Sequence, residues 1–255
     1  MNLYTAFRKE WMESLRSYRL LIVVIVLVIF GLTSPLQALL LPKVLAQALP
    51  IPAGTDISAF IKPAKVSDSV AQYVKNMSQF DLILAVLLAM GAVAQEKDKG
   101  TAAMMMVKPL PRGSFLGAKF LGLAAMFAIG IAIAGIGAYY YTGLLFEFMP
   151  IVPWLVLNVF LFLYVLVILA ITLFCSTITN SQAAAAGIAF GIFAVGWIAG
   201  AIRGFGKYLP GELNTWGQRL MQGDTTMSWI ALGVSIGLIV VPLLAAWMIF
   251  KRQEL

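Results

Sequence analysis

The sequence predicts an all-α integral membrane protein that crosses the bilayer six times as a single domain, 1–255. Of its 255 residues, 61% are hydrophobic and only 11% are charged, whereas about a quarter of the residues in a soluble domain are charged. The apolar runs are long enough to cross the hydrocarbon core, which takes about 20 helical residues. They are also continuous, whereas the strands of a membrane barrel alternate apolar and polar residues.

Six segments meet these criteria, and each ends at polar or helix-breaking residues. They are 20–41, 77–95, 116–141, 151–175, 183–202 and 228–250. Pro35 lies in the second half of the first segment, where its missing backbone donor is expected to kink the helix. The segment 203–227, before the last span, carries a short amphipathic pattern and is predicted to form one or two short helices at the outer face.

Residues 1–19 precede the first span and predict an amphipathic helix. Leu3, Phe7, Trp11 and Leu15 recur at every fourth position, so on a helix they form one apolar stripe, with the basic residues mostly on other faces. Such a helix lies along the inner membrane surface with its basic residues at the lipid head groups. The alternative interpretation is a plain cytoplasmic extension of the first span.

The distribution of positive charge predicts the orientation. With the N-terminus inside, the predicted inner segments hold 11 of the 18 Lys and Arg residues, and the outer segments hold seven. Because Lys and Arg are enriched in cytoplasmic loops, both termini are predicted to be cytoplasmic. The net charge of +7 is then largely a topology signal, and no nucleic-acid partner is expected.

Two features inside the spans raise the question of a transport path. Gly130, Ala134 and Ala138 recur at every fourth position of the third span; this spacing lets a neighbouring helix approach closely, which favours bundle packing over the alternative of a channel lining. Asp81 is an acid within the second predicted span, and acids inside the membrane are pathway candidates. The alternative is that Asp81 lies near the outer interface, hydrated or hydrogen-bonded to a neighbour.

The sequence does not predict a site for enzymatic chemistry. The chain has no histidine and one cysteine, Cys175, so it has no Ser-His pair, no internal disulfide and no thiolate metal cluster. The phosphate-binding pattern G-x-x-x-x-G-K-[ST] does not occur either. We therefore expect no cofactor, no metal and no enzymatic activity in this chain.

Residues 96–114 form a polar block between the second and third spans. Gly100 and Thr101 are expected to end one helix and begin another, and Pro109 is expected to end the new helix. The short helix between them reads AAMMMVK, and methionine side chains suit an adaptable docking surface. Lys119, further on, is expected to reach the membrane edge. The alternative is that the block only anchors the loop inside by its positive charge.

This block carries the spacing E-x-x-x-G-T…P-x-x-R…G-x-K, formed by Glu96, Gly100, Thr101, Pro109, Arg112, Gly117 and Lys119. Together with the amphipathic N-terminal helix, the six spans and the helical outer segment, it resembles the permeases of ATP-binding-cassette (ABC) transporters of the type-2 exporter family. The resemblance covers the whole chain and is to the stand-alone permease subunits, which carry no nucleotide-binding domain. Family members often have an acid soon after the Gly-Thr pair, whereas Ala102 and Ala103 follow it here.

The resemblance implies that the block is a short cytoplasmic coupling helix seated in a separate ABC ATPase subunit. ATP-driven closure of two ATPase copies would tilt the spans of two permeases, identical or different, and export a substrate across a prokaryotic plasma membrane. The residues implied in ATPase coupling are Glu96, Gly100, Thr101, Met104, Met105, Pro109 and Arg112. The apolar spans favour a hydrophobic or amphipathic cargo. The alternatives are a non-transporting membrane scaffold or assembly protein, and a secondary transporter.

Overall fold

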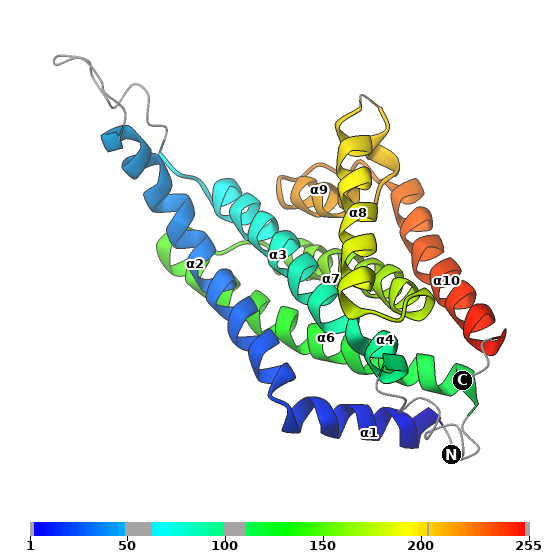
Figure 1. Cartoon of the computed structure of the whole chain (residues 1–255). Coiled ribbons are helices and arrows are strands. Elements are labelled where there is room, and N and C mark those ends of the chain that lie inside the picture. Colours follow the sequence, from blue (N-terminus) through cyan, green and yellow to red (C-terminus); the bar gives the residue numbers. More distant parts are fainter. Residues whose placement is uncertain (1–2, 49–62, 99–110, 203, 253–255) are drawn as a thin grey trace.

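The computed structural model describes residues 3–48, 63–98, 111–202 and 204–252, and its regular elements are all helices (Figure 1). Six helical segments in this part of the chain are long and apolar enough to cross a membrane, which confirms the predicted fold class. They are α2 (Arg19–Ala48), α3 (Val66–Ala89) with α4 (Gly91–Asp98), α6 (Arg112–Leu145), α7 (Ile151–Ile178), α8 (Gln182–Ala201) and α10 (Trp229–Arg252).

The N-terminal helix α1 (Leu3–Arg16) is separate from the first span. Tyr18, between α1 and α2, has a φ of 57°, a left-handed conformation that is uncommon outside glycine and turns the chain sharply. In Figure 1, α1 runs across the foot of the bundle at a steep angle to α2 and lies against α6. The segment is therefore not a straight extension of the first span.

The second span differs most from its prediction, because it begins at Val66 and runs for 33 residues to Asp98. The predicted span began after Gln72 and Asn76 because both side chains are polar. In the structure, both make hydrogen bonds to α2. Their side-chain amides donate to Gln37 Oε1 of α2 at 2.8 and 2.9 Å, and the Asn76 amide also donates to Ser34 Oγ at 2.9 Å. Helix α2 likewise continues through Pro35 to Ala48.

The core lies where α2, α3, α6 and α7 pack together. The small-residue stripe of α6 faces α2, as bundle packing predicted. A Cβ atom added to Gly130 would lie 2.9 Å from Leu27 Cδ1 and 3.1 Å from Val23 Cγ1. Ala134 and Ala138 are fully buried, and Ala134 approaches Gly31 of α2 so closely that a Cβ there would lie 3.0 Å from the Ala134 carbonyl oxygen.

Substituting Gly130→Val is expected to destabilise the bundle, because overpacking a filled interface costs about 1–3 kcal/mol. The measurement is the midpoint of thermal unfolding of the purified chain in detergent. Gly187→Val is the matched control: Gly187 also lies inside a helix, α8, but a Cβ added there meets nothing within 4 Å apart from its chain neighbours and the backbone of its own helix. Equal losses for the two variants would mean that the α2–α6 approach is not close-packed in solution.

Two spans lie at the edge of the bundle. The buried residues of α8 are Ala185 and Ala189, and those of α10 are Ala231, Ser235, Ala246 and Phe250. The predicted outer segment forms the 3-10 helix η2 (Gly206–Tyr208) and α9 (Gly211–Met221). Helix α9 lies across the end of the bundle opposite α1 (Figure 1), and its Trp216 ring packs 4.7 Å from the Phe160 ring of α7.

Candidate functional site

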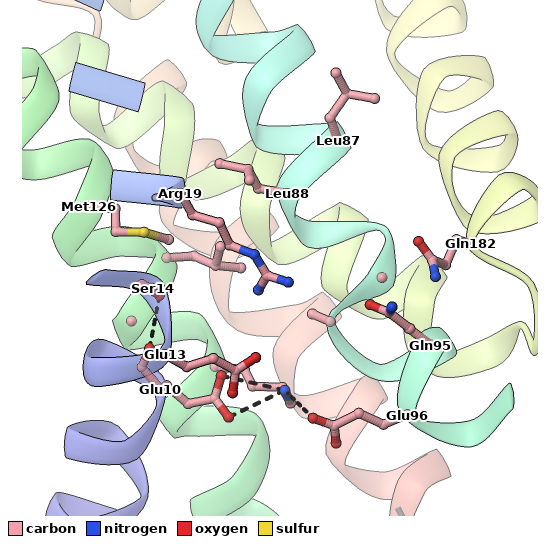
Figure 2. A pocket seen from close by; sticks show the side chains of 15 residues that line it. Glu10, Glu13, Ser14, Arg19, Leu87, Leu88, Gln95, Glu96, Met126 and Gln182 are labelled. Atoms are coloured by element: carbon pink, nitrogen blue, oxygen red, sulfur yellow. Dashed lines mark hydrogen bonds and ion pairs between the residues drawn. The ribbon is translucent and has the colours of Figure 1, made fainter. Parts of the chain in front are cut away.

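The beginnings of α1 and α6 and the ends of α4 and α10 lie at one face of the bundle, which we call the terminal face (Figure 1). Lys119 of α6 joins three of these helices. Its ammonium nitrogen lies 2.7 Å from Glu96 Oε1 of α4 and 3.3 Å from Glu10 Oε1 of α1. The Lys119 side chain is only 7% exposed, so it is a buried ion-pair partner rather than a side chain reaching the membrane edge. These three residues form the ion cluster (Figure 2, dashed lines).

Glu10 lies on the narrow face of α1 that packs against the bundle. Ala6 and Ser14, one turn before and one turn after Glu10, are both buried. The Ser14 hydroxyl donates to the Glu10 carbonyl oxygen at 2.8 Å, which satisfies its polar atom inside the contact. The face that packs on the bundle is therefore small and polar, and it lies beside the Leu3–Phe7–Trp11 stripe.

A pocket of about 390 Å³ opens beside the ion cluster, between α1, α3, α4 and α6 (Figure 2). Its lining combines charged and apolar side chains. The charged side chains are Glu10, Glu13, Arg19, Glu96 and Lys119, and the large apolar ones are Leu87, Leu88, Leu123 and Met126. Gln95 and Gln182 also line it. The part of the lining that the structure describes is thus amphipathic.

The second span is interrupted between α3 and α4, and Ser176 of α7 fills the interruption. The Ser176 hydroxyl oxygen accepts the backbone N–H groups of Val93 and Ala94, both at 3.0 Å, and the hydroxyl donates to the Met90 carbonyl oxygen at 2.7 Å. A side chain that enters the helical hydrogen-bond ladder is a recognised cause of a kink. One turn on, the Lys97 ammonium donates to the Thr177 carbonyl oxygen. Helix α4 is therefore fastened to the end of α7.

Ser176→Ala is expected to destabilise the folded protein by about 1–3 kcal/mol, because it leaves buried backbone donors without their acceptor. The measurement is the thermal unfolding midpoint in detergent. Thr179→Ala is the matched control, since the Thr179 hydroxyl donates only within its own helix, to the Cys175 carbonyl oxygen, and should cost little. If both variants unfold at the same temperature, Ser176 does not hold α4 to α7.

Arg112 ties the start of α6 to the end of α10. One guanidinium nitrogen donates to the carbonyl oxygens of Phe250 and Lys251, at 2.6 and 2.8 Å. A cation at the last carbonyl groups of a helix also complements its dipole. The Phe250 ring stacks on Phe115 of α6 at a centroid distance of 5.5 Å, so the contact is both polar and apolar.

The remaining residues predicted for ATPase coupling, Gly100, Thr101, Met104, Met105 and Pro109, lie outside the described residues. Their role stays a prediction. What the structure describes is the two flanks of the loop, and each flank binds other helices, through Glu96 on one side and Arg112 on the other.

The predicted interfacial residues of α1 are partly exposed. The rings of Phe7 and Trp11 stack at 6.2 Å, and Leu15 is 48% exposed. Phe7 lines an apolar groove of about 510 Å³ between α1, α6 and α7, together with Leu3, Tyr4, Leu121, Ala124, Ala125, Ala128 and Phe162. This is a surface suited to contact with lipid, and membrane placement of α1 stays a prediction.

Asp81 lies in the middle of its helical segment, whereas the alternative interpretation placed it near the start of the span. It is the sixteenth of the 33 residues in the second span, and it is completely buried. Neither of its carboxyl oxygens has a hydrogen-bond partner among the described residues. The expected position near the start of the span is therefore wrong, because the span begins 11 residues before its predicted start at 77. Whether Asp81 is hydrated stays a prediction.

Three residues of this site escaped the sequence reasoning: Glu10, Lys97 and Ser176. Glu10 could have been found from the small residues one turn on either side of it. Ser176 could have been found as a hydroxyl inside a strongly apolar run. Lys97 looked like a positive-inside charge, and nothing in its sequence context indicates its contact with α7.

Six helices long and apolar enough to span a membrane, with an N-terminal helix across their foot, define a multi-pass membrane protein. Residues 4–209 match the family model of ABC-2 family transporter proteins. The chain belongs to the ABC-2 transporter family and is a membrane permease of an ABC transporter. It is also 28% identical, over 251 residues, to a protein of Bacillus subtilis (strain 168) described as "uncharacterized transmembrane protein YxlG", with 97% of this chain and 96% of that protein covered.

Membership in this family has two consequences for the chain. It is the membrane transport component of its system rather than the catalytic one. It also implies association with an ABC ATPase subunit.

Proposed function

We propose that the chain is the permease of an ABC exporter and that a separate ATPase subunit drives it by moving the loop 96–114. The observation that carries this proposal is the anchoring of both loop flanks. Glu96 binds α6 and, through Lys119, α1. Arg112 binds the end of α10. A displacement of the loop is therefore passed to several spans at once.

Energy transfer through such a loop requires that the partner contacts it differently in two states. The first residues of the loop belong to helix α4, so α4 would move with the loop. Lys97 and Ser176 connect α4 to α7. Opening and closing of the ATPase would then tilt α4, α6, α7 and α10 relative to the rest of the bundle. Alternating access to the two sides of the membrane is the expected result.

The assembly we propose contains two permeases and two ATPase subunits in a prokaryotic plasma membrane. The exposed apolar faces of α8 and α10 leave room for lipid and for a second permease. Helix α1 would lie on the inner membrane surface, with Phe7, Trp11 and Leu15 among the lipids. Hydrolysis of ATP is assigned to the partner.

The test is purification of the chain with and without its ATPase. We expect the chain alone to hydrolyse no ATP, and we expect it to co-purify with a separately encoded ABC ATPase whose hydrolysis drives transport in proteoliposomes. Transport by the chain alone, driven by an ion gradient, would instead establish a secondary transporter. A chain that recruits no ATPase and transports nothing would be a membrane scaffold.

The orientation with both termini inside makes a separate prediction about labelling. In a Cys175→Ala background, a cysteine at Glu147, an exposed position between α6 and α7, should react with an impermeant maleimide in whole cells. A cysteine at Ser17, exposed at the α1–α2 turn, should react only after the cells are opened. The opposite pattern would reverse the topology. Glu147 is preferred to Gly143, where an added Cβ would overlap the Phe148 ring.

A further inference from the structure

We infer that α9 is a gate over a water path that runs between α3 and α7 as far as Asp81, and that α9 moves away when this path opens. The role of the path in transport rests on the proposed function, whereas the gate itself does not. Three observations lead to this inference: the depth at which α9 packs, the direction in which Asp81 faces, and the buried acceptors without partners at the same place.

Helix α9 packs into the bundle rather than only on its end. Leu213 of α9 is completely buried, and the Trp216 ring packs on Phe160, the tenth of the 28 residues of α7. On the other side, the Asn214 amide donates to the Ser78 hydroxyl of α3 at 2.9 Å. Ser78 is the thirteenth residue of α3. Helix α9 therefore covers α3 and α7 well beyond the ends at which both helices begin.

Asp81 lies directly beyond this contact. It follows Ser78 by three residues, about 4.5 Å further along α3. At about 100° per residue, its side chain leaves the helix about 60° from that of Ser78 and, on the other side, about 80° from that of Tyr73. Ser78 bonds to α9, and the Tyr73 hydroxyl donates to Asn158 of α7 at 2.7 Å. Asp81 thus faces the junction of α3, α7 and α9.

Three buried oxygen atoms at this junction have no hydrogen-bond partner among the described residues. They are both carboxyl oxygens of Asp81 and the amide oxygen of Asn214. Buried polar groups in proteins are almost always hydrogen-bonded, and an unpaired one costs free energy. Water donates readily to carboxyl and amide oxygens. A path that brings water past α9 to the junction therefore accounts for the acceptors gathered there.

The connections of α9 allow it to move as a unit. Gly204 and Gly223, on either side of the segment that holds η2 and α9, have φ angles of 83° and 82°. Both are left-handed turn conformations that glycine adopts readily, and a few such residues at the ends of an element absorb the backbone changes of a moving segment. Among the described residues, the Asn214–Ser78 bond is the only side-chain hydrogen bond between α9 and α3. Breaking it should favour opening.

The test measures how fast a cysteine at Asp81 reacts with a water-soluble reagent. Asp81→Cys is made in a Cys175→Ala background, placed in lipid nanodiscs and exposed to 2-(trimethylammonium)ethyl methanethiosulfonate, and the intact mass reports modification. Both membrane faces are accessible, so the result does not depend on orientation. We expect a slow reaction that Asn214→Ala or Ser78→Ala accelerates about fivefold, as loss of one hydrogen bond shifts an opening equilibrium.

Two controls separate opening of the gate from general loosening. Ala134→Cys is completely buried where α6 packs on α2, and it should stay unreactive in every variant. Thr142→Ala removes a buried hydrogen bond between α6 and α3, and it should not change the rate at Asp81→Cys. The gate is overturned if Asn214→Ala and Ser78→Ala leave the Asp81→Cys rate unchanged. It is also overturned if Thr142→Ala raises that rate equally, or if Ala134→Cys becomes equally reactive.

The complex with the ATPase separates this inference from the proposed function. MgATP should raise the reaction rate of Asp81→Cys in that complex, and ATP hydrolysis without such a rise would remove the path from transport. Failure to recruit an ATPase would overturn the proposed function, while acceleration by Asn214→Ala in the permease alone would still support the gate. ATP hydrolysis by a complex in which neither Asn214→Ala nor Ser78→Ala has an effect would overturn the gate alone.

Discussion

Lys119→Met is expected to destabilise the folded permease by about 3 kcal/mol, because it removes the ammonium from between Glu10 and Glu96. Loss of one partner of a buried ion pair costs about 3–5 kcal/mol, and the lower end applies here since the two carboxylates are 16% and 17% exposed and keep some water. The same change also releases α1 and α4 from α6. The measurements are the thermal unfolding midpoint and the fraction of monodisperse protein in size-exclusion chromatography.

Removing the two carboxylates should reverse most of this loss. The triple variant Lys119→Met with Glu10→Gln and Glu96→Gln leaves no repelling charges, so its unfolding midpoint should lie well above that of Lys119→Met alone. Lys207→Met is the control for loss of an exposed lysine and should be close to neutral. If the triple variant is no more stable than the single one, the three residues do not act as a unit.

The six spans could be predicted because a membrane helix is defined by the composition of its own residues. Each span is long and apolar by itself, and no knowledge of its neighbours is needed to find it. The role of the stripe Gly130, Ala134 and Ala138 could also be predicted, because small residues at every fourth position allow a neighbouring helix to approach closely. The spacing did not predict which helix would approach, and in the structure that helix is α2.

The features that escaped prediction depend on contacts between helices. Gln72 and Asn76 lower the local hydropathy, and only their bonds to Gln37 and Ser34 explain why the second span extends past them. That extension is what places Asp81 in the middle of the helical segment rather than near its start. A one-dimensional average of hydropathy cannot detect polar groups that satisfy each other across two helices.

The spacing of Glu96 and Lys119 in the loop pattern singled out both residues before any contact between them was known. The structure shows that they bind each other directly, at 2.7 Å. Glu10 completes the pair from a helix more than 80 residues away in sequence, and no local rule connects it to them. Within the pattern, Glu96 and Lys119 thus also hold one flank of the loop in place.

Arg112 and the loop methionines need separate substitutions in a test of ATPase coupling. Arg112 binds the last carbonyl groups of α10 within the chain, so Arg112→Glu would disturb the permease itself. A double variant that combined it with a methionine change would not report on docking alone. Met105 carries no charge and lies between the two anchored flanks, which makes it the better single probe.

Met105→Asp is therefore expected to weaken the complex with the ATPase about 30-fold and to abolish ATP-driven transport, while the permease remains folded. The factor corresponds to about 2 kcal/mol, the cost of losing one anchor residue of an interface. The measurements are co-purification of the ATPase, ATP hydrolysis by the complex and the unfolding midpoint of the permease alone, which should not change. Lys207→Glu, an exposed charge change near α9, should leave the complex intact. Normal ATPase binding and transport by Met105→Asp would mean that the loop serves only as a positive anchor, and energy would then have to enter the permease at another surface of the terminal face.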